Sequence, residues 1–214
     1  MRTPPALANA PLDEVLDQAR RLVVRQARDW AELVVDVEAP SRFMLLTEDG
    51  RVAGFAVERD GGSEAIGRWF LGARRPFVVG IFSPTDRSPS LVVRRPWTWI
   101  FSRVEVEDGA GRPLGTVRER FTPFRRTFDV EAPDGRLLAR IVGPFFRPWT
   151  FLIRSAAGTR ELGRIEKRWA GLLTEALTDA DTFLVTLPLS DPALRRLTVG
   201  AAVLIDYRFF EGRD

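Results

Sequence analysis

The side chains that most often catalyse reactions are largely missing from this chain. Its 214 residues include no cysteine and no histidine. Neither a thiol nor an imidazole can therefore act as nucleophile, general base or metal ligand, and disulfide bonds cannot form. No Gly-x-Ser-x-Gly nucleophile motif is present, and the glycine-rich stretch 109–115 lies between two expected strands, which indicates a hairpin turn rather than a dinucleotide-binding loop. We expect that the protein is not an enzyme.

Two aspartates form the candidate metal site. Asp179 and Asp181 are separated by one residue, and carboxylate oxygens are ligands that Ca²⁺ prefers. The chain has no cysteine and no histidine, so any metal ion that it binds must be held by oxygen atoms. The alternative is a structural role, in which Thr178 or Asp179 is a cap that ends one secondary-structure element and starts the following strand.

Arginine and aromatic side chains recur together in the segments 74–77, 94–97, 123–126 and 145–149. The basic residues are almost all arginines, an excess that genomic coding bias also produces, and Lys167 is the single lysine. Arginine forks onto phosphate, and aromatic side chains beside basic ones favour the surface of an anionic phospholipid membrane. No nucleic-acid recognition motif accompanies them, so no nucleic-acid partner is expected. The candidate lipid-contact residues are Arg74, Arg75, Arg94, Arg95, Trp97, Trp99, Arg125, Arg126, Arg147 and Trp149.

The elements that would position these residues are short β-strands. Residues 103–107 and 128–131 alternate between polar and apolar side chains, as half-buried strands do. Asp-Gly turns recur between apolar runs, and Val106, Val130 and Ile153 each precede a turn at spacings of 24 and 23 residues. The pattern predicts a meander of about a dozen strands, and closure into one barrel leaves no strand edge exposed.

Alternate turns of an up-and-down barrel lie at opposite ends. Counting along the chain places the Asp-Gly turns at one end and the four arginine-aromatic segments at the other. There they would form one rim that binds an anionic surface. The alternative is that the aromatic side chains close this end of the barrel and the arginines only solubilise it.

A charge-free stretch of nine residues, 197–205, follows the expected strands. It is too short to cross a bilayer, which takes about 20 apolar residues, and Asp206 and Arg208 come directly after it. An apolar helix outside a membrane must be buried, and Gly200, Ala201 and Ala202 would let it fit inside a narrow barrel.

The expected domain organisation follows from these elements. Residues 1–20 form a leader with a short helix, and residues 21–214 form a single barrel domain with a central helix at about 192–210. The fold class is mainly β (α+β): a roughly twelve-stranded, mostly up-and-down β-barrel that encloses a C-terminal apolar helix.

Several stretches of the chain, in this order, resemble the phospholipid scramblase family. They are LVVRQ (22–26), EAPSRFMLLTEDG (38–50), RRPFVVGIFSP (74–84), LVVRRPW (91–97) and the tail GRIEKRWAGLLTEALTDADTFLVTLPLSDPALR (163–195) followed by LTVGAAVLIDYRFFEG (197–212). The resemblance implies a Tubby-like fold, with a twelve-stranded barrel around a C-terminal helix. Relatives carry an acylated cysteine cluster where this chain has Trp-Thr-Trp-Ile-Phe at 97–101, so this chain cannot be anchored through thioesters.

The resemblance also implies a calcium loop with ligands at positions 1, 3, 5, 7, 9 and 12. Because only two carboxylates are available in it, the expected cofactor is a weakly bound Ca²⁺ ion. An acidic residue is expected at the twelfth position, where this chain has Ser190, with Asp191 one residue later. The alternation of residues 183–187 indicates a strand whose carbonyls are already paired. The corresponding residues are Asp179, Asp181, Phe183, Val185, Leu187 and Ser190.

The function implied by the resemblance is that of a phospholipid scramblase-family protein, which binds anionic membrane phospholipid and promotes transbilayer lipid movement. The alternatives are a Tubby-like regulatory module that binds phosphoinositides or proteins without transporting lipid, and a purely structural domain. The N-terminal stretch does not have the pattern of a signal peptide. We therefore expect a cytoplasmic protein, peripheral on the inner face of the plasma membrane.

Overall fold

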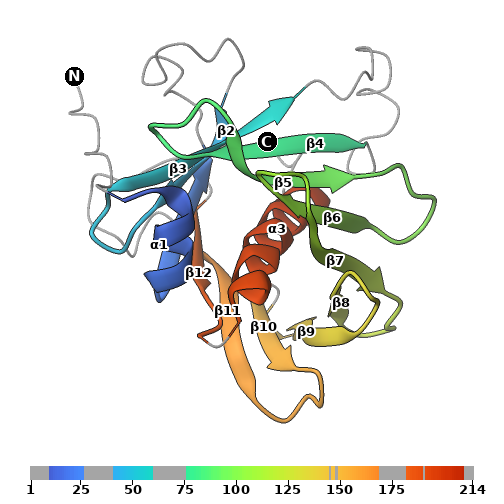
Figure 1. Cartoon of the computed structure of the whole chain (residues 1–214). Coiled ribbons are helices and arrows are strands. Elements are labelled where there is room, and N and C mark those ends of the chain that lie inside the picture. The colour runs from blue at the N-terminus through green and yellow to red at the C-terminus, as the bar shows by residue number, and fades with distance from the viewer. Residues whose placement is uncertain are drawn as a thin grey trace.

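Twelve antiparallel strands close into one barrel in the computed structural model, which describes residues 10–26, 41–59, 76–144, 146–147, 149–168, 182–189 and 191–209 (Figure 1). The predicted fold class is confirmed. The strands are β1 (Arg21–Gln26), β2 (Ser41–Leu46), β3 (Val52–Arg59), β4 (Phe77–Phe82), β5 (Pro89–Arg95), β6 (Arg103–Asp108), β7 (Pro113–Arg120), β8 (Arg126–Glu131), β9 (Leu137–Gly143), β10 (Thr150–Ser155), β11 (Glu161–Arg168) and β12 (Thr182–Thr186).

The barrel has the up-and-down order that the sequence predicts. Each strand pairs with the next one along the chain, and β1 pairs with β12 to complete the ring. The closing pair aligns Leu22 with Val185 and Val24 with Phe183, and all four side chains are buried in the core. Closure supplies hydrogen-bond partners on both sides of every strand.

A repeated hairpin explains the regular spacing of Val106, Val130 and Ile153 in the sequence. The register shifts after Val106 in β6–β7, after Val130 in β8–β9 and after Ile153 in β10–β11. Such bulges bend the strands and increase their twist, which a closed barrel of short strands requires. Opposite Val106 lies Gly115, which has φ +145°, and a Cβ atom there would collide with the Glu131 carbonyl.

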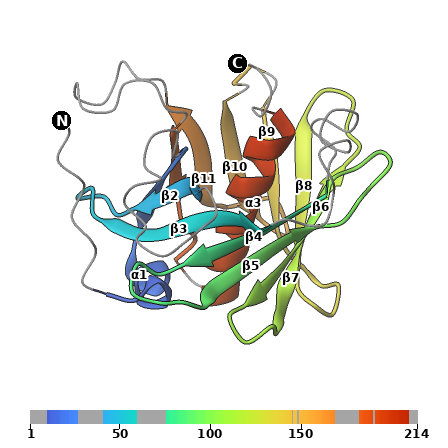
Figure 2. The same cartoon turned by 90° about the horizontal axis from the view of Figure 1, so that it is seen from above.

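Helix α3 (Pro192–Phe209) runs along the inside of the barrel, with its C-terminus near the upper rim in Figure 2. Asp191 caps its start, because its Oδ1 accepts hydrogen bonds from the amides of Ala193 (2.9 Å) and Leu194 (3.2 Å). Residues 197–207 of the helix are all buried. A Cβ atom at Gly200 would lie 2.7 Å from the Val106 side chain, so the helix contacts the wall as closely as the sequence predicts. Within the described ranges, no helix is long and apolar enough to span a bilayer.

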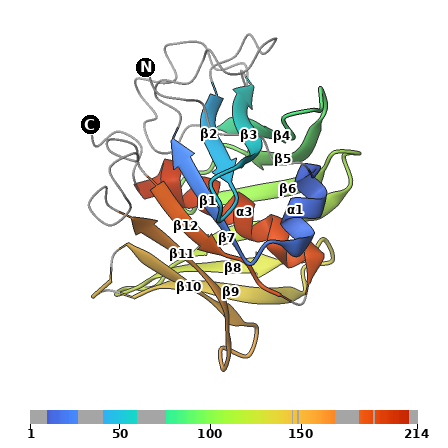
Figure 3. The same ribbon diagram turned by 90° about the vertical axis from the view of Figure 1, so that its left-hand side faces the viewer.

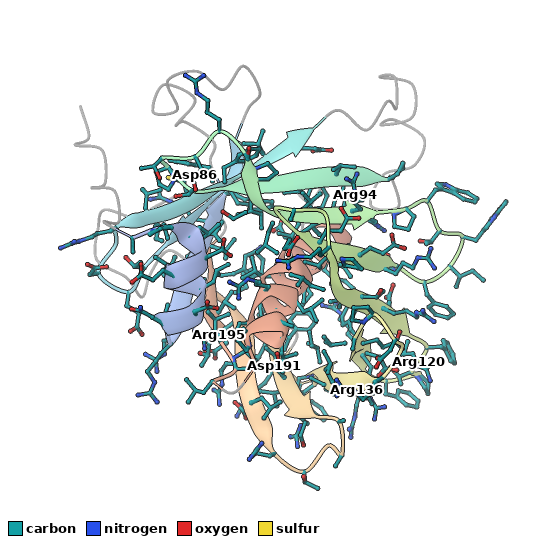
Figure 4. All side chains as sticks on the ribbon, in the orientation of Figure 1. Asp86, Arg94, Arg120, Arg136, Asp191 and Arg195 are labelled. Atoms are coloured by element: carbon teal, nitrogen blue, oxygen red, sulfur yellow. The ribbon has the colours of Figure 1, made fainter. Side chains whose placement is uncertain are left out.

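The end of the barrel at which α3 begins is closed by α1 (Leu12–Gln18), which lies beside the start of α3 (Figure 3). Leu12 and Leu16 of α1 are completely buried in the core. The Arg195 side chain lies between the two helices (Figure 4) and donates hydrogen bonds to the carbonyls of Leu16, Ala19 and Pro188. Burial lowers the pKa of Arg195. Residues 12–19 of the expected leader therefore pack against the barrel.

The two ends of the barrel carry different connections. Turns at 47–51, 109–112, 132–136 and 156–160 lie at the end where α3 begins, which we call the turn end. Connections at 96–102, 121–125 and 144–149 lie at the opposite end, where α3 finishes, and we call it the aromatic end.

Candidate membrane-binding site

Exposed apolar side chains are concentrated at the aromatic end. Eight large hydrophobic side chains are exposed among the described residues, and seven of them lie in the three connections at this end. The eighth, Leu189, lies at the turn end. The seven, with the exposed fraction of each, are Trp97 (45%), Trp99 (76%), Ile100 (68%), Phe101 (40%), Phe121 (75%), Phe124 (76%) and Phe146 (92%).

The β5–β6 connection holds the two tryptophans in one cluster. The Trp97 and Trp99 rings meet edge to face, with their centroids 4.7 Å apart. Phe101 approaches Phe121 of the next connection at 6.3 Å. The Phe101–Phe121 contact therefore joins the β5–β6 connection to the β7–β8 connection.

Glu119 of β7 fixes this connection to the barrel and to the helix. Its carboxylate accepts hydrogen bonds from the Ser102 amide (3.0 Å) and from Nε of Arg208 (3.2 Å), and its own amide donates to the Ser102 carbonyl at 2.7 Å. The sequence alone did not identify this residue, because its partners lie 17 and 89 positions away.

Three of the predicted lipid-contact arginines lie on the surface. Arg125 and Arg147 are exposed in the connections after β7 and β9. Arg94 is also exposed (Figure 4). It pairs through Nε with Glu107, at 3.1 Å. Trp149 is half-buried, and the ammonium group of Lys167 lies 5.7 Å from its ring centre.

Arg95 lies inside the barrel, contrary to the predicted surface position. It is 2% exposed, and its Nη2 donates a hydrogen bond to Ser102 Oγ at 2.7 Å. The reason is the two-residue period of a strand: Leu91, Val93 and Arg95 face inward, whereas Arg94 faces outward.

Some aromatic residues close the barrel end from within, as the alternative interpretation proposed. Tyr207 stacks on Phe77 at 4.1 Å, and Phe209 stacks on Phe151 at 6.0 Å. The half-buried Arg126 lies with its guanidinium carbon 4.2 Å from the centre of the Phe209 ring. The inner aromatic residues and Arg126 therefore seal this end of the barrel, and a second set remains exposed outside it.

The remaining predicted site residues, Arg74, Arg75, Asp179 and Asp181, lie outside the described residues. Sequence reasoning did not include Phe121 among the lipid-contact residues. A signal was present, because Phe121 follows directly after β7 and precedes a Thr-Pro turn. A large apolar residue at such a turn indicates an exposed hydrophobic surface.

Of the calcium loop that the resemblance implies, the structure describes Phe183, Val185 and Leu187, whereas Asp179, Asp181 and Ser190 lie outside the described residues. Phe183 and Val185 belong to β12, which pairs with β1 and β11, so their backbone carbonyls take part in the sheet as the sequence predicts. Asp191 caps α3. Among the described residues, no three acidic side chains gather where they could hold a metal ion.

The described part of the chain is a closed antiparallel barrel that is filled by its own C-terminal helix, and seven of its eight large exposed apolar side chains lie at one end. The family model named Scramblase matches residues 1–212, and the chain belongs to that family.

Curated relatives are similar over nearly the whole chain. Phospholipid scramblase 1 from Mus musculus is 28% identical over 97% of this chain and 66% of that protein. Phospholipid scramblase 2 from Bos taurus is 26% identical over 97% of this chain and 74% of its own length. The chain therefore spans about two thirds of the mouse protein. No solved structure gives a significant match.

Proposed function

We propose that this scramblase-family protein binds anionic phospholipid bilayers through its aromatic end and promotes transbilayer lipid movement. The observation that carries the proposal is the concentration of exposed apolar side chains at this end, seven of the eight in the described part of the chain. Exposed apolar patches of this kind mark binding surfaces. The relatives' names supply the lipid class.

Two forces would hold the protein on the membrane. The exposed aromatic rings bury apolar area when they enter the boundary between headgroups and acyl chains. Arg125 and Arg147 lie beside them, and each arginine near an anionic leaflet contributes about 1 kcal/mol. The anionic leaflet of a cell faces the cytoplasm, so the proposed location is peripheral, on the inner face of the plasma membrane.

Lipid movement would follow from the depth of this contact. Amphipathic surface elements enter a membrane by about 5–10 Å, which displaces lipids of one leaflet only. Side chains from three separate connections would enter together at the aromatic end. We propose that the resulting packing defect lowers the barrier for a headgroup to cross the bilayer.

Vesicle binding and leaflet exchange test the two halves of this proposal separately. The protein should co-sediment with vesicles that contain phosphatidylserine and bind less to pure phosphatidylcholine vesicles. Binding should weaken as salt shortens the Debye length from about 10 Å at 0.1 M to about 3 Å at 1 M. In a dithionite assay, added protein should increase the fraction of inner-leaflet fluorescent lipid that becomes accessible.

The outcomes separate the candidate functions. If the protein binds vesicles but does not increase lipid exchange between leaflets, lipid transport is contradicted, and the protein is a lipid-binding module. Equal binding to both kinds of vesicle would contradict the role of the arginines, and no binding at all would overturn the whole proposal.

Calcium, in this proposal, binds only weakly and through Asp179 and Asp181. Two carboxylates without an acidic twelfth ligand resemble poorly liganded sites, so we expect a dissociation constant no tighter than about 10⁻⁴ M. Calorimetry with Ca²⁺ should show binding that disappears in the double variant Asp179→Asn, Asp181→Asn. Sub-micromolar affinity, or binding unchanged in the double variant, would contradict this prediction.

A further inference from the structure

An open groove of about 1060 Å³ lies on the outer face of the barrel, along β7 to β10. Its volume is slightly above the range of small-molecule sites, about 300–1,000 Å³. Arg120, which lines the groove, lies on the side of the barrel wall away from α3 (Figure 4). The groove reaches the aromatic end, because its lining includes the exposed Phe121, Phe124 and Phe146.

The groove floor consists of two rows of outward-facing side chains, which the strand registers align. The first row runs across three strands through Asp129, Arg140 and Arg154. The second row lies two residues closer to the aromatic end, about 7 Å along the strands. It consists of Thr127, Val142 and Leu152.

The charge of the groove is positive. Four arginines and one carboxylate line it, which gives a net charge of +3. Asp129 is buried, and its two carboxylate oxygens are held by Arg140 at 2.9 Å and Arg120 at 3.2 Å. One carboxylate cannot neutralise two guanidinium groups, and Arg125 and Arg154 add further positive charge.

The apolar side chains of the groove lie toward the aromatic end. Arg140 and Arg154 lie away from that end, and the Val142 and Leu152 row follows. Arg120 is aligned with Thr127 of the second row and reaches back to Asp129, and Arg125 lies at the aromatic end with the three exposed phenylalanines. A ligand that complements this order has an anionic group at one end and a hydrocarbon chain at the other. An anionic phospholipid has this structure.

We propose that the groove binds a single anionic phospholipid, with its headgroup on Arg140 and Arg154 and an acyl chain directed past Val142 and Leu152 to the aromatic end. This inference rests on the proposed function and adds a site for the lipid itself. The headgroup of a lipid bound in this way lies on the outer face of the barrel, outside the bilayer. Its chain leaves the groove where the bilayer would lie.

Binding of a monomeric lipid tests the groove without a bilayer. The probes are dihexanoyl phosphatidylserine below its critical micelle concentration, glycerophosphoserine, which lacks acyl chains, and inorganic phosphate. Calorimetry should show binding of the short-chain lipid at least about tenfold tighter than binding of the other two probes. Equal affinity for all three would reduce the site to a general anion site and overturn the proposal.

Two groove variants and one control locate the binding. Arg140→Ala removes one headgroup contact but leaves Asp129 paired with Arg120, and Val142→Trp fills the groove from an outward-facing position. Each should weaken binding of the short-chain lipid by about tenfold or more, the effect of one charge-assisted hydrogen bond or of a blocked site. Arg136→Ala, at the exposed turn end, should bind like the wild type.

Failure of the groove and failure of membrane docking are distinguishable. The groove variants retain Trp97 and Trp99, so they should still co-sediment with phosphatidylserine vesicles. Wild-type binding to vesicles but not to the monomeric lipid would overturn the groove alone, as would wild-type affinity in both groove variants. Binding of the monomeric lipid without vesicle binding would support the groove and contradict the docking.

Discussion

Replacing Ala201 with arginine should prevent the barrel from folding. Ala201 lies in the middle of α3 and is completely buried. Its neighbour Gly200 approaches Val106 so closely that even a Cβ atom would need the wall to move. An unpaired buried charge costs several kcal/mol, which is comparable to the entire free energy of unfolding of a typical domain, about 5–15 kcal/mol. We expect Ala201→Arg to be recovered as aggregate, without the cooperative thermal transition of the wild type in circular dichroism.

The matched control inserts the same side chain at an exposed position. Ala110 lies in the exposed turn between β6 and β7, so Ala110→Arg should melt within a few degrees of the wild type. A folded Ala201→Arg variant with an unchanged melting temperature would show that α3 does not fill the barrel in solution.

Removing both tryptophans of the β5–β6 connection should strongly weaken membrane binding. Trp97 and Trp99 are 45% and 76% exposed and contact each other, and neither is part of the buried core. Burial of a large apolar side chain stabilises by about 1.5–3 kcal/mol. Even partial insertion of two indoles therefore predicts about 30-fold weaker partition of the Trp97→Ala, Trp99→Ala variant onto phosphatidylserine vesicles. Vesicle co-sedimentation over a range of lipid concentrations measures this change.

Salt and a control at the opposite end identify the origin of the effect. The loss should be similar at low and high salt, because apolar burial is not screened as charge attraction is. In contrast, Arg125→Glu should weaken binding mainly at low salt. Leu189→Ala removes a side chain of similar exposure, 69%, from the turn end and should bind like the wild type. Equal losses in Leu189→Ala and in the tryptophan variant would show that the aromatic end is not the docking surface.

The barrel itself could be predicted from the sequence because its signals are local. Alternation of side chains reports which face of a strand is buried, as Val104 and Val106 show in β6. Asp-Gly turns indicate where strands reverse. The charge-free stretch before Asp206 predicted the buried helix, since nine apolar residues cannot cross a bilayer.

The inward position of Arg95 was missed although its signal was also local. The residue continues the inward-facing series of Leu91 and Val93. Its arginine side chain and the following proline favoured a surface interpretation. In the structure, a hydrogen bond to Ser102 at 2.7 Å and the nearby Phe77 ring accommodate the buried guanidinium. Strand period therefore outweighs residue type at this position.

The sequence by itself determined the strand pattern, the buried helix and the position at one barrel end of the three arginine-aromatic connections that the structure describes. Only the tertiary structure decided which of these residues are exposed, how Glu119 fixes the β5–β6 connection, and where the groove lies. The physical reason is range: periodicity and turn chemistry act over a few residues, whereas Asp129, Arg140 and Arg154 meet only through the registers of three paired strands. Those registers depend on bulges and on closure of the whole barrel, and a reading along the chain cannot supply them.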